Sequence, residues 1–317
     1  MLLKRFFASL TLAAVVMPAG AEMPKELNFG IISTESTQSL KTSWQPFLAD
    51  MEKAVGIRVN AFFASDYAGI IEAMRFNKVQ LAWHGNKSAM EAVDRANSEV
   101  FARVVYADGS LGYHSYLAVH RDSSMKSLED LLRGAKGISF GIGDPNSTSA
   151  FLVPSFYIFA QNNIDPKTAF KSVRSANHET NILAVANRQV DASVFASDAW
   201  ERVSRNRPEF ASQIKVIWKS PLIPSDPMLW RKDLDPEAKR RVKGFFLGYG
   251  KSDAREKAIL KDLQYSAFLE SSNDQLKPIR QLELFRERTK VAGDERMSGA
   301  ERQEKLADLD RKLAELK

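Results

Sequence analysis

Three consecutive hydroxyl residues follow a glycine-rich turn in the segment ISFGIGDPNSTSA, residues 138–150. They are Ser147, Thr148 and Ser149, and we expect an apolar strand before the turn and an apolar helix after it. The N–H groups at a helix start and the positive end of its dipole attract anions. Ordinary N-capping needs one hydroxyl rather than three. The segment therefore predicts a site for a tetrahedral oxyanion that uses no Lys or Arg, and the missing GxxxxGK[ST] motif argues against a phosphate-binding P-loop.

Other polar side chains stand where expected strands meet expected helices. His178 and Tyr67 each begin a helix, and Tyr113 lies at a candidate crossover between domains. Capping or surface exposure is the alternative role for the histidine, and buried packing is the alternative for the tyrosines. Asp198 comes just after a strand and could instead cap the next helix, whereas Asp226, in SPLIPSDPM, could instead form a turn with the following proline.

These positions depend on an alternation of strands and helices that begins at Leu27. The helix ending at Val55 has an apolar stripe at i, i+3, i+4 spacing, and Pro46 inside it could kink or restart it. The pattern predicts parallel βαβ units and the α/β class, in which ligands bind at the carboxyl ends of strands. Expected strands are 27–33, 57–63, 79–83, 101–106, 115–120, 138–142, 192–196 and 214–218; expected helices end at Val55 or span 67–76, 127–133, 147–162, 179–188 and 236–249.

The first 21 residues have the three parts of a secretory signal peptide. Lys4 and Arg5 precede an apolar run, residues 6–17, and small residues lead to a cleavage site expected after Ala21. The alternative, a membrane anchor, needs about 20 apolar residues, which is longer than this run. We therefore expect export to the periplasm.

The composition of the 317 residues excludes several kinds of chemistry. The chain has no Cys, so thiolate nucleophiles, Cys-ligated metals, disulfides and a lipoprotein anchor are excluded. Its net charge of +6, from 45 Lys and Arg against 39 Asp and Glu, falls to +4 when the signal peptide leaves. Export, and the lack of basic runs interleaved with aromatic residues, argue against a nucleic-acid partner.

The C-terminal residues 283–317 are charged and favour helix. Leu306, Leu309, Leu313 and Leu316 follow the 3-4-3 spacing of a coiled coil, over less than two heptads. Two interpretations stay open: a helix packed on its own chain, and a homodimer through this helix.

Seven blocks in order resemble the phosphonate-binding periplasmic proteins of ABC importers, over about residues 27–285. The blocks are GIISTES, VNAFF-S-DYAGIIEAMRFNKV, GNKSAMEAVDRAN, DPNSTSAFLVPSFY, HETN-LAVANRQVD, IKVIWKSPLIPSDP and PIRQL. The resemblance implies a type II periplasmic binding protein with two α/β lobes, each a mixed or parallel sheet flanked by helices, and a C-terminal helical tail. The expected divisions are the signal peptide 1–21, lobe 1 from 22–115 and 221–282, lobe 2 from 116–220, and the tail 283–317.

The resemblance also implies a ligand, a partner and residue roles. The ligand is a phosphonate, best known in this family as 2-aminoethylphosphonate, and the partner is an inner-membrane ABC permease. Asp198 and Asp226 would bind the ammonium group of 2-aminoethylphosphonate. The residues implied to bind the phosphonate oxygens are Ser147, Thr148, Ser149, Tyr67, Tyr113 and His178.

Two residues depart from the family pattern. His84 stands where the family has Tyr, and Asp198 stands where it has Glu, which is one methylene longer. The second departure bears on the preference for the aminoethyl compound. The main alternative is therefore the same fold binding phosphite, phosphate, methylphosphonate or a sulfonate.

An enzyme is the remote alternative. The four His show neither HxH nor HExxH spacing, and no GxSxG motif is present. We therefore expect no catalytic residues, metal or cofactor, and rank a phosphonate or phosphoester hydrolase last.

Overall fold

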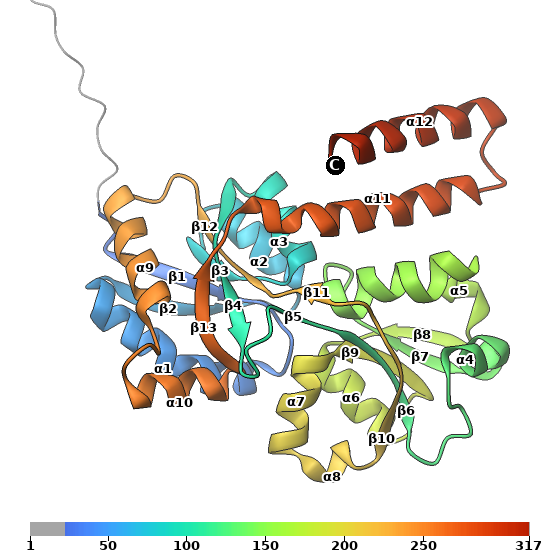
Figure 1. Cartoon of the computed structure of the whole chain (residues 1–317), viewed down its shortest axis with the longest axis horizontal. Helices are drawn as coiled ribbons and strands as arrows, with labels where there is room; N and C mark the ends of the chain where they lie inside the picture. The colour runs from blue at the N-terminus through green and yellow to red at the C-terminus, as the bar shows by residue number, and fades with distance from the viewer. Residues whose placement is uncertain (1–22, 317) are drawn as a thin grey trace, which may run out of the picture.

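The computed structural model describes residues 23–316, so the expected signal peptide lies outside the described residues. Two lobes, each built on a sheet flanked by helices, lie side by side (Figure 1). Within this part of the chain, no helix is both long and apolar enough to cross a membrane.

The first lobe is built on a six-stranded sheet in the order β13-β4-β12-β3-β1-β2. Its strands are β1 (Glu26–Ile31), β2 (Arg58–Phe63), β3 (Leu81–Trp83), β4 (Ser98–Tyr106), β12 (Pro227–Arg231) and β13 (Tyr265–Glu270). Its helices are α1 (Thr37–Val55), α2 (Tyr67–Arg75), α3 (Asn86–Arg95), α9 (Pro236–Gly248), α10 (Ala254–Asp262) and the short η5 (Asn273–Leu276).

The second lobe is built on a five-stranded sheet in the order β10-β6-β9-β7-β8. Its strands are β6 (Ser115–His120), β7 (Ser139–Ile142), β8 (Ser172–Ser175), β9 (Ala192–Ala196) and β10 (Ile214–Lys219). Its helices are α4 (Leu128–Gly134), η1 (Ala135–Gly137), α5 (Pro166–Ala169), α6 (His178–Ala186), α7 (Ser197–Asn206) and α8 (Pro208–Ala211). The chain crosses between the lobes twice, where β5 (Gly112–Tyr113) pairs with β11 (Ile223–Pro224).

Both sheets are mixed, whereas the strand–helix alternation predicts parallel pairing. The prediction is right for β1 with β2 and β3, and for β7 with β8 and β9. It is wrong for β6, which runs antiparallel to β9 and β10. Two strands that the pattern did not predict, β12 and β13, run antiparallel to β4. The chain returns from the second lobe along β11, and β12 then enters between β3 and β4 in the opposite direction. The first residue of β12 is Pro227. Proline is rare in central strands, so the sequence pattern did not indicate a strand here.

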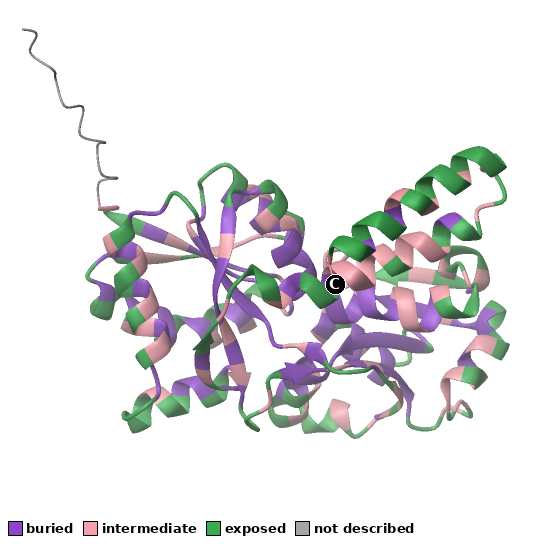
Figure 2. Cartoon of the chain, turned by 45° about the horizontal axis from the view of Figure 1, so that its top comes forward, coloured by how far each residue is buried: buried purple, intermediate pink, exposed green. Residues whose placement is uncertain are grey.

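Helix α1 confirms the predicted apolar stripe, because Trp44, Phe47 and Met51 on it are buried. The Phe47 ring lies 5.3 Å from that of Phe246 on α9, so the stripe joins the sheet to the outer helices. Pro46 neither breaks nor restarts the helix. Its side chain is exposed, so the carbonyl that loses its backbone donor lies on the face open to water. Figure 2 shows the buried residues gathered along the strands and the inner faces of the helices.

The predicted helix 147–162 is irregular. It consists of two π-helical turns, η2 (Thr148–Leu152) and η3 (Ser155–Phe159), followed by the 3₁₀ turn η4 (Ala160–Asn162). Pro154 between the π turns has no N–H to donate to the Ala150 carbonyl four residues earlier. That carbonyl instead accepts from the Gly143 N–H at 2.8 Å, which ties the glycine-rich turn to the helix. Only glycine fits there, because a Cβ on residue 143 would lie 2.3 Å from the Ala150 Cβ.

The tail is helical as predicted over its described residues, but its expected boundary at residue 283 falls inside a helix. Residues 277–315 form a hairpin of α11 (Lys277–Ala292) and α12 (Gly299–Glu315). Leu309 and Leu313 are buried inside the chain, while Leu306 and Leu316 stay partly exposed. Arg280 of α11 pairs with Asp94 of the first lobe at 2.7 Å. Further along, α11 packs on η3 and η4 of the second lobe. The hairpin therefore contacts both lobes (Figure 1).

Asn181 joins three segments of the second lobe. Its buried Nδ2 donates to the carbonyls of Ile142 on β7, at 3.0 Å, and of Ala176 and Val194, at 3.3 Å. We predict that Asn181→Ala lowers the free energy of unfolding by about 2–3 kcal/mol, because it leaves buried carbonyls without donors. Asn187→Ala, at the exposed end of the same helix, should change it by less than about 0.5 kcal/mol. Equal changes in urea unfolding of the two variants would contradict this role.

Candidate ligand site between the lobes

A small cavity lies between the lobes. All eight residues predicted for the site line it, although they come from segments as far apart as α2 and the return crossover. Residues that sequence reasoning missed are also in the lining. The complete lining is Ile32, Thr34, Tyr67, Trp83, Gly85, Tyr113, Ser147, Thr148, Ser149, His178, Ala196, Asp198, Arg202 and Asp226.

Helices from both lobes begin at the cavity wall. Tyr67, Thr148 and His178 are the first residues of α2, η2 and α6, and Gly85 is the N-cap of α3. Asp66, Ser147 and Asn177 cap α2, η2 and α6 with their side chains, whereas Gly85 caps α3 without one. The positive ends of several helix dipoles therefore face one small volume, which favours an anion there.

The hydroxyl groups in the cavity are arranged as donors. Ser147 Oγ accepts from the Ala150 N–H at 3.2 Å, and Thr148 Oγ1 accepts from the Lys87 N–H at 2.8 Å, across the lobe boundary. Because each oxygen already accepts a backbone N–H, its own hydrogen is free to point into the cavity. Burial raises the pKa of the Tyr67 and Tyr113 phenols well above their usual value, so both keep their protons.

His178 is also a donor. Its Nδ1 accepts from the Ala196 N–H at 3.1 Å, which places the proton of the neutral ring on Nε2. That Nε2 lies 3.3 Å from the Tyr67 hydroxyl of the other lobe. Burial, with a smaller contribution from Arg202, lowers the pKa of His178 to about 4, against the opposing effect of Asp198. The ring is therefore a neutral donor at neutral pH.

The same cavity contains two carboxylates. Burial, and then the charge of Asp198, raise the pKa of Asp226 well above its usual value. Four buried polar atoms in the lining have no hydrogen-bond partner among the described residues: Thr34 Oγ1, Trp83 Nε1, Asp198 Oδ1 and Asp226 Oδ1. Buried polar atoms nearly always have partners. Four such atoms around one cavity indicate a site built for a ligand.

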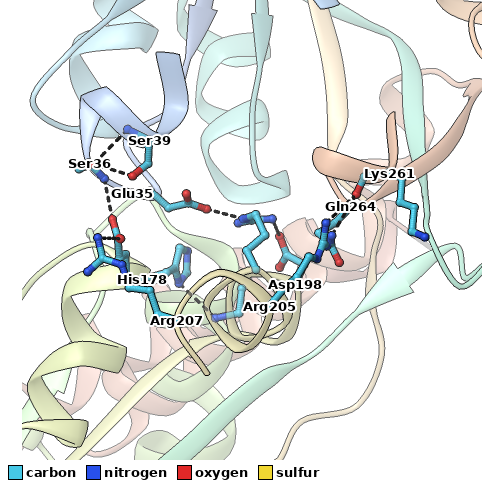
Figure 3. A network of polar contacts seen from close by, with 12 residues as sticks. Glu35, Ser36, Ser39, His178, Asp198, Arg205, Arg207, Lys261 and Gln264 are labelled. Atoms are coloured by element: carbon cyan, nitrogen blue, oxygen red, sulfur yellow. Dashed lines mark hydrogen bonds and ion pairs between the residues drawn. The ribbon is translucent and has the colours of Figure 1, made fainter. Parts of the chain in front are cut away.

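Contacts between the lobes surround the cavity. The Tyr67 N–H donates to Asp144 at 3.2 Å, and the Ser36 N–H donates to Glu179 at 3.1 Å. Figure 3 shows Ser36 and Glu35 of the first lobe facing the helices of the second. The lobes are therefore closed on the site.

The expectation of a site free of Lys and Arg is wrong for the cavity as a whole, because Arg202 lines it. A signal was present in the sequence: Arg202 lies four residues after Asp198 on α7, hence on the same helix face. Thr34 and Trp83 were missed although they follow or end parallel strands, where the carboxyl-end rule applies.

His84, which stands where the family pattern has Tyr, does not line the cavity. It is fully buried, and its Nδ1 lies 3.0 Å from Ser88 Oγ, which donates to the Gly85 carbonyl. Its effect on the ligand is therefore indirect. Within residues 23–316, no group of three or more His, Asp or Glu side chains is placed to hold a metal ion.

Residues 29–276 match the family model described as the periplasmic substrate-binding protein of a phosphonate ABC transporter. The chain belongs to this family. It is 54% identical over 303 residues to the phosphonates-binding periplasmic protein of Escherichia coli K12, covering 95% of this chain and 88% of that protein.

Solved structures agree with the family assignment. A binding protein component of an ABC phosphonate transporter from Pseudomonas aeruginosa is 55% identical and has a TM-score of 0.91, over 93% of this chain and 97% of that one. PhnD1 from Prochlorococcus marinus, in complex with methylphosphonate, has a TM-score of 0.74 at 22% identity, over 82% and 97% of the two chains. The chain thus has the type II periplasmic binding protein fold and is the periplasmic phosphonate-binding component of an ABC transporter.

The buried His84 makes stability depend on pH. Burial lowers its pKa from 6.5 to about 3, so the unfolded chain takes up a proton below pH 6.5 that the folded chain refuses. The contribution of His84 to the free energy of unfolding is therefore fully present above pH 6.5 and falls as the pH drops toward 3. We predict that His84→Gln reduces the slope of the free energy of unfolding against pH by up to about 1.4 kcal/mol per pH unit. Urea unfolding at pH 7, 6 and 5 tests it, and identical slopes for variant and wild type would contradict it.

Proposed function

We propose that this protein captures 2-aminoethylphosphonate between its closing lobes and delivers it to an inner-membrane permease. The observation that carries the proposal is the composition of the cavity, which combines converging helix starts and oriented hydroxyl donors with two carboxylates. Donors suit the phosphonate oxygens, and carboxylates suit an ammonium group.

The residue roles follow this division. Ser147, Thr148 and Ser149 donate to the phosphonate from their hydroxyls and from the start of η2, together with Tyr67, Tyr113 and His178. Asp198 and Asp226 receive the ammonium group, each through the Oδ1 atom that has no partner in the described chain. Hydrogen bonds to charged groups contribute about 1.5–3 kcal/mol each, so a few of them fix the orientation of the ligand.

The proposal includes the processing and division of the chain. Residues 1–21 are removed after Ala21 during export. Residues 22–115 and 221–282 form one lobe and residues 116–220 the other, which is supported by the strands that each range contributes to the two sheets. Residues 283–317 form the tail.

Calorimetry of the protein beginning at Glu22 tests the proposal with four ligands: 2-aminoethylphosphonate, methylphosphonate, phosphite and phosphate. We expect the amino compound to bind most tightly. Tighter binding of phosphite or phosphate would assign the site to that anion. No binding of any of them, or turnover of one, would overturn the function.

Asp198→Asn separates the two halves of the ligand. The lost charge should weaken the binding of 2-aminoethylphosphonate by about tenfold or more. It should weaken the binding of methylphosphonate by less than about threefold. Glu201→Gln is the matched control, because it removes an exposed carboxylate of the same helix that does not line the cavity. Equal losses of both ligands in Asp198→Asn would remove Asp198 from its role.

We also propose that two copies pair through the tail hairpin. Leu309 and Leu313 are used within the chain, but Leu306, Leu316 and the 45% exposed Phe285 leave apolar surface on the hairpin. Truncation after Gly293 should convert a dimer into a monomer in sedimentation velocity. A full-length chain that sediments as a monomer would limit the leucines to intramolecular packing.

A further inference from the structure

Arg202 is a buried arginine whose side chain is about 10% exposed. Its Nη1 donates to Asp198 Oδ2 at 2.9 Å, one turn back on α7. Its Nε donates to Glu35, which precedes α1 in the opposite lobe. Figure 3 shows Glu35 on the side of the helix that carries Asp198. One side chain thus connects a cavity carboxylate to the lobe that closes over it.

The bond to Arg202 leaves Asp198 with one open oxygen. Oδ2 is occupied, whereas Oδ1 is buried and has no partner among the described residues. The charge-assisted bond from Arg202 restrains Oδ2 and so limits the rotation of the carboxylate. Orientation matters here, because an Asp side chain is shorter than a Glu and has less reach toward a ligand.

The arginine does not cancel the attraction for a cation. Glu35 and Asp198 carry two negative charges in their ionised forms against the single positive charge of Arg202, so the group keeps a net charge of −1. Asp198 is the carboxylate of this group that faces the cavity, because it lines the cavity and Glu35 does not.

We propose that Arg202 is the positioning residue that determines specificity for the amino group of the ligand. It holds Asp198 by Oδ2 and turns Oδ1 toward the ammonium, and Glu35 of the other lobe holds Arg202 in place when the lobes are closed. The inference rests on the proposed function and adds to it a residue that contacts the ligand only through Asp198.

Two contributions follow that can be separated. The Arg202–Asp198 bond lies within one lobe and acts on the amino group. The Arg202–Glu35 bond crosses between the lobes and favours closure over any ligand. Loss of the first therefore changes the ratio of affinities for two ligands, and loss of the second changes both affinities together.

The experiment measures dissociation constants of 2-aminoethylphosphonate and methylphosphonate by calorimetry for a set of variants. Arg202→Met keeps the length of the side chain but removes its charge and donors. We expect it to shift the ratio of the two dissociation constants against 2-aminoethylphosphonate by at least about tenfold, equivalent to about 1.4 kcal/mol. Arg202→Lys, which keeps the charge, should restore the ratio to within about threefold of wild type.

Two controls remove contacts between the lobes without touching Asp198. Glu35→Gln should weaken both ligands. Because it also removes one negative charge of the group, it should shift the ratio against the amino compound by no more than about threefold. Arg205→Met, on the same helix as Arg202, removes a bond of 3.2 Å to the Lys261 carbonyl of the other lobe and should keep the ratio. If Arg202→Met fails to fold, the double variant with Glu35→Gln leaves one fewer unpaired buried charge and should show the same shift of the ratio.

The outcomes separate the inference from the function. A ratio that Arg202→Met leaves unchanged, or moves in favour of the amino compound, overturns the inference while both ligands still bind the wild type. Wild-type protein that binds methylphosphonate but not the amino compound also overturns it and leaves phosphonate capture standing. Wild-type protein that binds neither overturns the proposed function and the inference with it.

Discussion

An oxyanion taken out of water needs several hydrogen-bond donors at once, and few lone pairs nearby to repel it. In this cavity backbone amides orient neutral side chains as donors, although two carboxylates line the cavity as well. The Lys87 N–H occupies the Thr148 oxygen, and the Ala196 N–H occupies Nδ1 of His178, so each of these side chains has its hydrogen left for the cavity. The order of the strands, the helix starts and the closure of the lobes all serve this arrangement.

Closure completes the site, because its donors are divided between the lobes. The Lys87 amide belongs to the first lobe and the Thr148 hydroxyl to the second, and the same is true of Tyr67 and His178. An open protein would separate these pairs and admit water to them. The paired crossover strands β5 and β11 connect the lobes, and the closed arrangement brings these pairs together.

Local patterns in the sequence predicted the eight site residues because each lies at a strand end, a helix start or a crossover. They could not show which junctions meet, since that depends on β12 entering between β3 and β4 from the other lobe. Arg202 escaped prediction because an arginine on a helix is usually solvated. The helix expected at residues 147–162 is present, but its π-helical turns could not be predicted. They accompany the release of the Ala150 carbonyl at Pro154, which depends on Gly143 being near enough to donate to it.

The bond between Gly143 and Ala150 has a consequence for how such a protein can change its ligand over time. The turn that positions the hydroxyl donors tolerates no Cβ at residue 143, so the backbone that carries Ser147, Thr148 and Ser149 is hard to change. The carboxylate half consists of side chains alone, and each can be exchanged without rebuilding a helix start. One fold can therefore keep a fixed site for the phosphonate group while related proteins change the side chains that bind the rest of the ligand. Selectivity can then evolve faster than the capacity to bind.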